Sequence, residues 1–174
     1  CIVYFTFGSL VSHWKSYWKE GQKYLEKAIQ YAIESGNILI AGYSHCIILE
    51  NQYLMGTILN KVWEQVQKSR NYAEKIKHEN LANNVAIYGQ AVSTLMGRSS
   101  STFTGVEDID ESSYIKLIES DKAALATYYF SKMQLCYLFG DYFDALAAAE
   151  KVKSCEGAIM GLMLSAQFNF YHSL

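Results

Sequence analysis

The tetrapeptide Tyr53-Leu54-Met55-Gly56 indicates the fold class, because it recurs twice further along the chain. It returns as Thr94-Leu95-Met96-Gly97 and as Tyr137-Leu138-Phe139-Gly140, with the glycines 41 and 43 residues apart. Repetition at such a period is typical of helical repeat proteins, in which each unit packs on its neighbours. The sequence therefore predicts a row of helix pairs, in which the first helix of each pair ends at one of these glycines.

The segments around the first tetrapeptide have the periodicity of packed helices. Apolar residues recur every three or four positions from Tyr17 to Ile33 and from Ile58 to Ile76, opposite faces rich in lysine and glutamate. Between them, residues 38–55 are more uniformly apolar, which predicts a more deeply packed helix. Gly36 is the expected left-handed cap of one helix, and Thr57 is the expected N-cap of another.

The later part of the chain departs from this pattern once. Residues 97–112 are small, polar and acidic, which predicts a loop before a short helix from about Ser113 to Ser120. After it, Asp141 is the expected N-cap following Gly140. We predict one domain over residues 1–174, an all-α, right-handed α-solenoid of about 8–10 helices in antiparallel pairs. Its expected units cover residues 1–35, 38–77, 80–120 with the loop 97–112, 121–153, and the start of a further helix over 157–174.

Composition excludes several classes of partner. The chain has 15 basic and 17 acidic residues, a balance that gives no electrostatic reason to expect nucleic-acid binding, for which a clustered basic surface is typical. The apolar run from Ile2 to Val11 is shorter than the roughly 20 residues that a membrane span needs. We therefore expect neither nucleic-acid binding nor membrane insertion. Four scattered cysteines without metal-ligand spacing favour free thiols and a cytoplasmic protein: Cys1, Cys46, Cys136 and Cys155.

Motifs that would carry catalysis are incomplete. His78-Glu79-Asn80-Leu81-Ala82 begins like the zinc-protease HExxH helix, but Ala82 replaces the second ligand, so an exposed turn between helices is the better interpretation. Residues 97–101 lack the lysine of a phosphate-binding loop. His13 and His45 have no partner at helical spacing and are expected to be packing residues. We therefore expect no enzymatic activity, no cofactor and no metal ion.

Two resemblances to known families accompany these patterns. Gly140-Asp141-Tyr142, followed by Ala145 and Ala149, resembles the second half of a tetratricopeptide repeat. The period here is longer than the usual 34 or so residues, and the usual terminal proline is absent.

A second resemblance extends over almost the whole chain. The ordered segments that carry it are 7–14, 41–43, 95–98, 135–142 and 168–174. Together they are similar to the helical-repeat region of very large bacterial signalling ATPases. In those proteins this region joins a serine/threonine-kinase-like domain and an AAA-type ATPase to a GAF domain and a sensor histidine kinase. The resemblance implies a middle segment of a signal-transduction protein of the two-component type.

Function is predicted from the surface that such a stack presents. If the first helix of each pair lines the inner curve, as in tetratricopeptide stacks, alignment on the tetrapeptides places seven candidate partner contacts in the groove: Tyr43, Glu50, Tyr53, Asn84, Thr127, Gln134 and Tyr137. Tyrosine and amide side chains suit peptide recognition, although packing inside the fold remains an alternative. We expect a non-catalytic scaffold that binds a peptide, a protein or flanking domains of the same chain. The alternative is a sensor module that binds an apolar small molecule between helices.

Both ends read as cuts through a longer protein, because the chain begins without methionine and stops within an apolar pattern. Cutting a solenoid leaves apolar end faces, which favour self-association. We therefore expect a homodimer through one of two sets of residues: Ile2, Val3, Tyr4 and Phe5, or Phe168, Phe170 and Tyr171.

Overall fold

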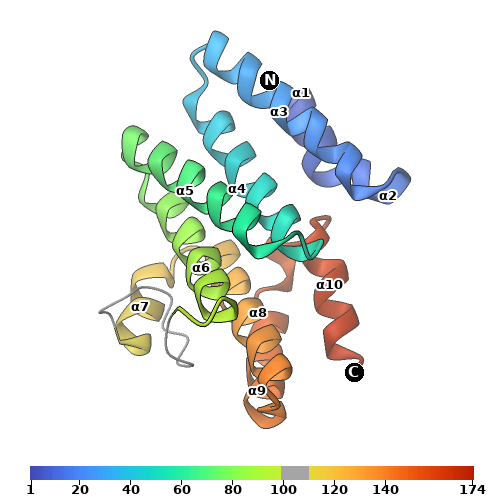
Figure 1. Ribbon diagram of the computed structural model, residues 1–174, viewed down its shortest axis with the longest axis vertical. Coiled ribbons are helices and arrows are strands. Elements are labelled where there is room, and N and C mark those ends of the chain that lie inside the picture. Colours follow the sequence, from blue (N-terminus) through green and yellow to red (C-terminus); the bar gives the residue numbers. More distant parts are fainter. Residues whose placement is uncertain (99–109) are drawn as a thin grey trace.

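The computed structural model describes residues 1–98 and 110–174, which are helical throughout and contain no strand (Figure 1). Most of the predicted loop 97–112 lies outside the described residues. Among the described residues, no helix combines the length and apolar character required to cross a membrane. The elements are α1 (Ile2–Thr6), a π-helical turn η1 (Phe7–Val11), α2 (Ser12–Lys15), α3 (Trp18–Glu34), α4 (Ile38–Leu54), α5 (Leu59–Ile76), α6 (Glu79–Leu95), α7 (Glu111–Ile118), α8 (Lys122–Phe139), α9 (Tyr142–Lys153), a 3-10 turn η2 (Glu156–Ala158) and α10 (Met163–His172).

Helices that follow one another in the chain pack against one another. This holds for α3 with α4, α4 with α5, α5 with α6, and α8 with α9, while the segment α1–η1–α2 covers α3. In addition α4 contacts α6, and α6 contacts α8. These three helices therefore form a continuous row, which is visible near the centre of Figure 1.

Left-handed residues end the helices of the repeat. Gly36, Gly56, Gly97 and Gly140 have φ of 73°, 65°, 67° and 88°. The predicted cap at Gly36 is confirmed, since the backbone N–H of Asn37 reaches back to the Ala32 carbonyl at 2.8 Å. At the end of α5 the same backbone conformation is adopted by Lys77, with φ of 52°.

Two helices, α5 and α7, begin at residues other than the predicted ones. Helix α5 begins at Leu59 rather than directly after Thr57, because the Thr57 N–H is engaged with the Gln52 carbonyl in the closing turn of α4. Helix α7 begins at Glu111 rather than near Ser113, because the Asp110 carboxylate accepts the Ser113 N–H at 3.1 Å and caps an earlier turn. Asp141 does occupy the N-cap position of α9, but its side chain makes no capping bond.

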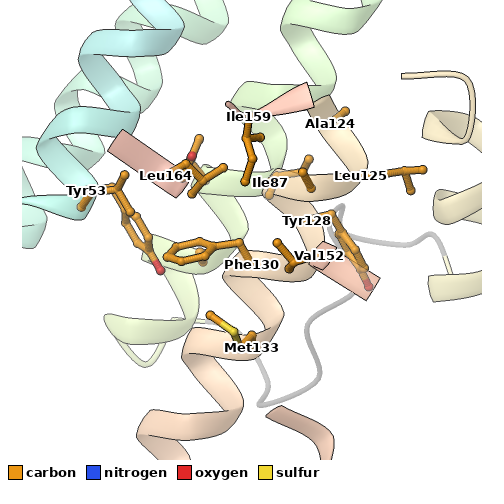
Figure 2. Packing of buried hydrophobic residues seen from close by; sticks show 14 of the residues in the cluster. Tyr53, Ile87, Ala124, Leu125, Tyr128, Phe130, Met133, Val152, Ile159 and Leu164 are labelled. Atoms are coloured by element: carbon orange, nitrogen blue, oxygen red, sulfur yellow. The ribbon is translucent and has the colours of Figure 1, made fainter. Parts of the chain in front are cut away.

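The C-terminal segment does not extend the row of helices. Helix α10 packs on α4, α8 and α9, and η2 packs on α8. Figure 2 shows Ile159 and Leu164 from this segment beside Ile87 and Phe130, within one apolar cluster. The expectation that Phe168 lies on an open end face is wrong, because this residue is 2% exposed in the same cluster. Tyr171 is half-buried, whereas Phe170, Ile2 and Val3 are exposed as expected.

The burial of Phe168 predicts that it stabilises the fold. Replacing it with alanine removes a fully packed ring, and such changes cost about 3–5 kcal/mol in the free energy of unfolding. The matched control is Phe170→Ala in the same helix, where the ring is 57% exposed, so that little change is expected. Urea unfolding followed by circular dichroism measures both variants. An equal loss in the two would contradict the described packing of α10.

The left-handed lysine at the end of α5 gives a second prediction. A side chain in this conformation is strained, so Lys77→Gly should raise the free energy of unfolding by about 0.5 kcal/mol. Lys75→Gly, two residues earlier and inside the helix, should lower it by about 1 kcal/mol. Thermal unfolding of both variants tests the sign of each effect, and stabilisation by both or by neither would show that the turn does not have this geometry.

Candidate functional site

A cavity of about 540 Å³ opens between α4, α6 and the start of α8. The segment before α10 closes one side of it through Ile159 and Leu162. The row of three helices supplies most of its lining: Tyr43, Cys46, Ile47 and Glu50 from α4, Asn80, Leu81, Asn84 and Tyr88 from α6, and Asp121, Lys122, Ala123 and Thr127 at or near the start of α8, with Phe5 and Ser120 at the margin.

Four of the seven predicted contact residues line this cavity, namely Tyr43, Glu50, Asn84 and Thr127. They come from three different helices, so the alignment on the repeated tetrapeptides brings together residues up to 84 positions apart in the chain. Their role in binding a partner remains a prediction.

The other three predicted contacts lie near the C-terminal helix instead. Gln134 donates a hydrogen bond from Nε2 to the Tyr171 hydroxyl at 3.0 Å. Tyr137 packs edge-on against the Tyr171 ring, with 5.7 Å between ring centroids. Tyr53 is 7% exposed, and its hydroxyl, which has no hydrogen-bond partner among the described residues, lies close enough to Tyr171 for the two to interact electrostatically. Sequence alone did not reveal that α10 returns to this part of the row.

A buried polar cluster spans the row next to the cavity. The Tyr88 hydroxyl in α6 donates to Glu50 Oε2 in α4 at 3.1 Å, and Thr127 in α8 lies close enough to Tyr88 to oppose the rise in the pKa of that tyrosine. All three side chains are buried. Because buried polar groups are costly unless they are paired, the bond between Tyr88 and Glu50 fixes the relative position of α4 and α6.

Burial controls the protonation of the groups around Glu50. Desolvation raises the pKa of Glu50 to about 7, although the hydrogen bond from Tyr88 opposes this change. Desolvation, together with the negative charge of Glu50, raises the pKa of Cys46 to about 12, which keeps this cysteine a thiol at neutral pH. The site therefore offers a carboxyl group that changes its charge near neutral pH.

The rings of Phe5 and Tyr43 line part of the cavity. The rings of Phe5 and Tyr43 have centroids 6.4 Å apart, and Tyr43 meets the ring of His78 at 6.3 Å. His78 is the N-cap of α6, where its Nδ1 accepts the Leu81 N–H at 3.3 Å. The prediction that His78-Glu79-Asn80-Leu81-Ala82 forms an exposed turn between helices is therefore confirmed only for His78, since residues 79–82 begin α6 and Leu81 is buried.

Tyr88 is the residue of the site that sequence reasoning missed. In an alignment of the units on the repeated tetrapeptides, the position of Tyr88 is equivalent to Ile47 in the preceding unit and to Ser131 in the following one. An apolar residue at the first of these positions indicated core packing, and no repeat-wide signal marked the tyrosine. The one available signal was that the preceding unit has an isoleucine at the position where this unit has a tyrosine, whose buried hydroxyl needs a polar partner.

His13, His45 and Arg98 do not line this cavity. Burial lowers the pKa of both His13 and His45. Arg98 lies over the ring of Trp63, with 5.5 Å from its guanidinium carbon to the ring centroid, while residues 99–101 of the phosphate-loop alternative are outside the described residues. Within residues 1–98 and 110–174, no three metal-ligating side chains gather at one point.

A scan against protein-family models gives no match, and neither does a search of curated proteins or of solved structures.

The raised pKa of Glu50 predicts how stability depends on pH. A carboxyl whose folded pKa is about 7, above its ordinary 4.5, stabilises the fold below pH 4.5, and this contribution is lost as the pH rises through 7. The Glu50→Gln variant stays neutral throughout. Its free energy of unfolding relative to the wild type should therefore increase by up to about 3 kcal/mol between the two ends of this range. Urea unfolding at several pH values measures the difference.

Glu74→Gln, at an exposed position of α5, is the matched control and should follow the wild type at every pH. Parallel curves for wild type and Glu50→Gln would show that the pKa of Glu50 is the same in the folded and the unfolded chain, which would contradict the raised pKa.

Proposed function

We propose that this chain is a non-catalytic α-solenoid module of tetratricopeptide type. It binds a segment of another protein, or of another domain of the same protein, along α4, α6 and α8. The residues that resemble the helical-repeat region of bacterial signalling ATPases support a place in a signal-transduction protein, in which this module sets the relative position of sensor and kinase domains.

The observation that carries this proposal is the packing of the C-terminal segment, residues 156–172, on the row of helices. This segment lies against the row of helices and buries Ile159, Leu164 and Phe168 there. Its Tyr171 hydroxyl accepts a hydrogen bond from Gln134. The row therefore already holds a short helical segment by apolar anchors and an amide contact, which is how peptides are commonly recognised in helical grooves.

The adjoining part of the row is open. Tyr43 and Asn84 line the same cavity as Ile159 and Leu162 of the C-terminal segment. The Tyr43 side chain is 41% exposed. A partially exposed tyrosine beside amide side chains suits an interface, because it combines a large contact area with hydrogen bonding. We infer that a partner segment enters next to the C-terminal segment.

Site-specific photo-crosslinking tests this function. p-Benzoylphenylalanine placed at Tyr43 should form an adduct with a defined protein, or with a defined domain of the same protein, in cells that make it at native level. The matched control is Tyr31 of α3, which is 40% exposed and does not line the cavity. The identified partner, once purified, should bind the Tyr43→Ala variant about tenfold more weakly. Adducts of the same kind from both positions, or none from Tyr43, would rule out binding at this face.

The alternative function, sensing of a small molecule, is favoured by one observation. The same cavity has the volume of a small-molecule site and a buried carboxyl on its wall. A thermal-shift screen separates the two functions, since a ligand present at 100 times its dissociation constant adds about 2.7 kcal/mol of stability. Stabilisation by a metabolite, without a protein adduct at Tyr43, would favour the sensor.

A further inference from the structure

We propose that the cavity binds a primary ammonium group on an apolar stem, as in a lysine side chain, with the Glu50 carboxylate as its counter-ion. This inference rests on the proposed function and names the chemical group that the partner presents. The same chemistry occurs in a free alkylamine, and the experiment below separates the two sources.

The first argument is that the Glu50 carboxyl is incompletely paired. It lines the cavity, it is 6% exposed, and the Tyr88 hydroxyl on Oε2 is its one hydrogen-bond partner within the described part of the chain. Oε1 has no hydrogen-bond partner within the described residues and is not one of the enclosed atoms that lack a partner, so it keeps some contact with solvent. A buried carboxyl with one free oxygen gains a charge-assisted hydrogen bond when a cation reaches it.

The second argument is that the chain itself supplies no cation to this carboxyl. Lys122 lines the same cavity but forms no ion pair with Glu50. None of the ion pairs within the described residues involves Glu50. Asp121, also in the lining, uses Oδ1 to accept the N–H groups of Ala123 and Ala124 at the start of α8. The negative charge that Glu50 acquires near neutral pH is therefore available to a ligand.

The third argument concerns the shape of the donor. The Tyr88 hydroxyl takes one acceptor position on Oε2, so fewer positions remain for the pair of parallel hydrogen bonds that a guanidinium group forms with a carboxylate. A compact ammonium group needs a single oxygen and turns its remaining donors elsewhere. The amide side chains of Asn80 and Asn84 in the same lining supply further acceptors.

The fourth argument concerns the stem. Besides the Glu50 carboxyl, the cavity is lined by the apolar side chains of Ile47, Ile159 and Leu162 and by the rings of Phe5 and Tyr43. An alkyl chain buries its surface against such a wall while its charged head reaches Glu50. A free inorganic cation would leave this apolar surface exposed to water, so the structure favours an ammonium carried on carbon.

The test uses the whole chain and two probes that differ in charge. Isothermal titration at about pH 8, where Glu50 is largely ionised, compares 1-aminopentane with 1-pentanol. We expect the amine to bind about tenfold more tightly than the alcohol, because the two share the apolar stem and differ in the charge-assisted contact. Equal affinity of the two probes for the wild type overturns the proposal.

Variants locate the contact. Glu50→Gln should bind the two probes equally, Glu50→Asp should retain part of the preference for the amine, and Glu74→Gln should retain all of it. Circular dichroism checks that each variant folds, and Glu50→Asp keeps the test decisive if Glu50→Gln does not fold. A preference for the amine that survives in folded Glu50→Gln places the amine elsewhere and overturns the proposal.

A further probe identifies the source of the ammonium group. The peptide acetyl-Ala-Lys-Ala-amide and its norleucine counterpart repeat the comparison within a peptide chain. A preference for the lysine peptide supports a protein partner, whereas a preference seen only with 1-aminopentane supports a free amine. If photo-crosslinking at Tyr43 captures a partner but neither amine is preferred, this inference fails and the interaction function stands. If the amine is preferred but no adduct forms, the interaction function fails while the ammonium site stands.

Discussion

The direct packing of α4, α6 and α8 is the contact on which the rest of this structure depends. At Gly42 of α4, an added Cβ atom would lie 2.4 Å from Leu81 Cδ1 of α6, so a larger residue there would displace the buried Leu81 side chain from this close contact. Further along the same row, Glu50, Tyr88 and Thr127 are buried, and the Tyr88 hydroxyl donates a hydrogen bond to Glu50. The close contact at Gly42 and the hydrogen bond between Glu50 and Tyr88 both set the distance between α4 and α6. The cavity lies next to both contacts, because Leu81, Glu50 and Tyr88 line it.

The same packing explains why Glu50 is available for binding. A carboxylate that is enclosed on most sides, with a single phenol as partner, is unfavourable for the isolated fold. Ionisable groups with shifted pKa values often lie in functional clefts, which agrees with the cation site proposed at Glu50. The neighbouring Cys46 thiol shares this desolvated environment, so the region is electrostatically arranged to attract positive charge and to keep its cysteine protonated.

Much of the local structure was predictable from sequence, because it depends on neighbouring residues. The glycine at 36 marks a helix end by conformational preference, and the three-to-four-residue periodicity from Tyr17 to Ile33 marks the helix between Trp18 and Glu34. Alignment on the repeated tetrapeptides also brought Tyr43 and Thr127 to one cavity.

What sequence could not reveal depends on contacts between distant segments. Neither periodicity nor composition of residues 156–172 indicates that this stretch turns back on the row, because an apolar helix face looks the same whether it packs on the preceding helix or on one a hundred residues earlier. For this reason Phe168 was expected at an open end and is buried instead. Tyr88 escaped notice on similar grounds, since its role follows from a partner on another helix.

The return of α10 to α4 also affects the order in which the molecule assembles. In an open array of repeats each unit contacts only its neighbours, so folding can begin anywhere and the ends open independently. Here the last helix contacts one that was completed more than one hundred residues earlier in the chain. This closure raises the contact order of an otherwise local topology, and it makes the docking of the C-terminal helix a late and slower event. During synthesis, the row of α4, α6 and α8 is thus left uncovered on this side until α10 emerges.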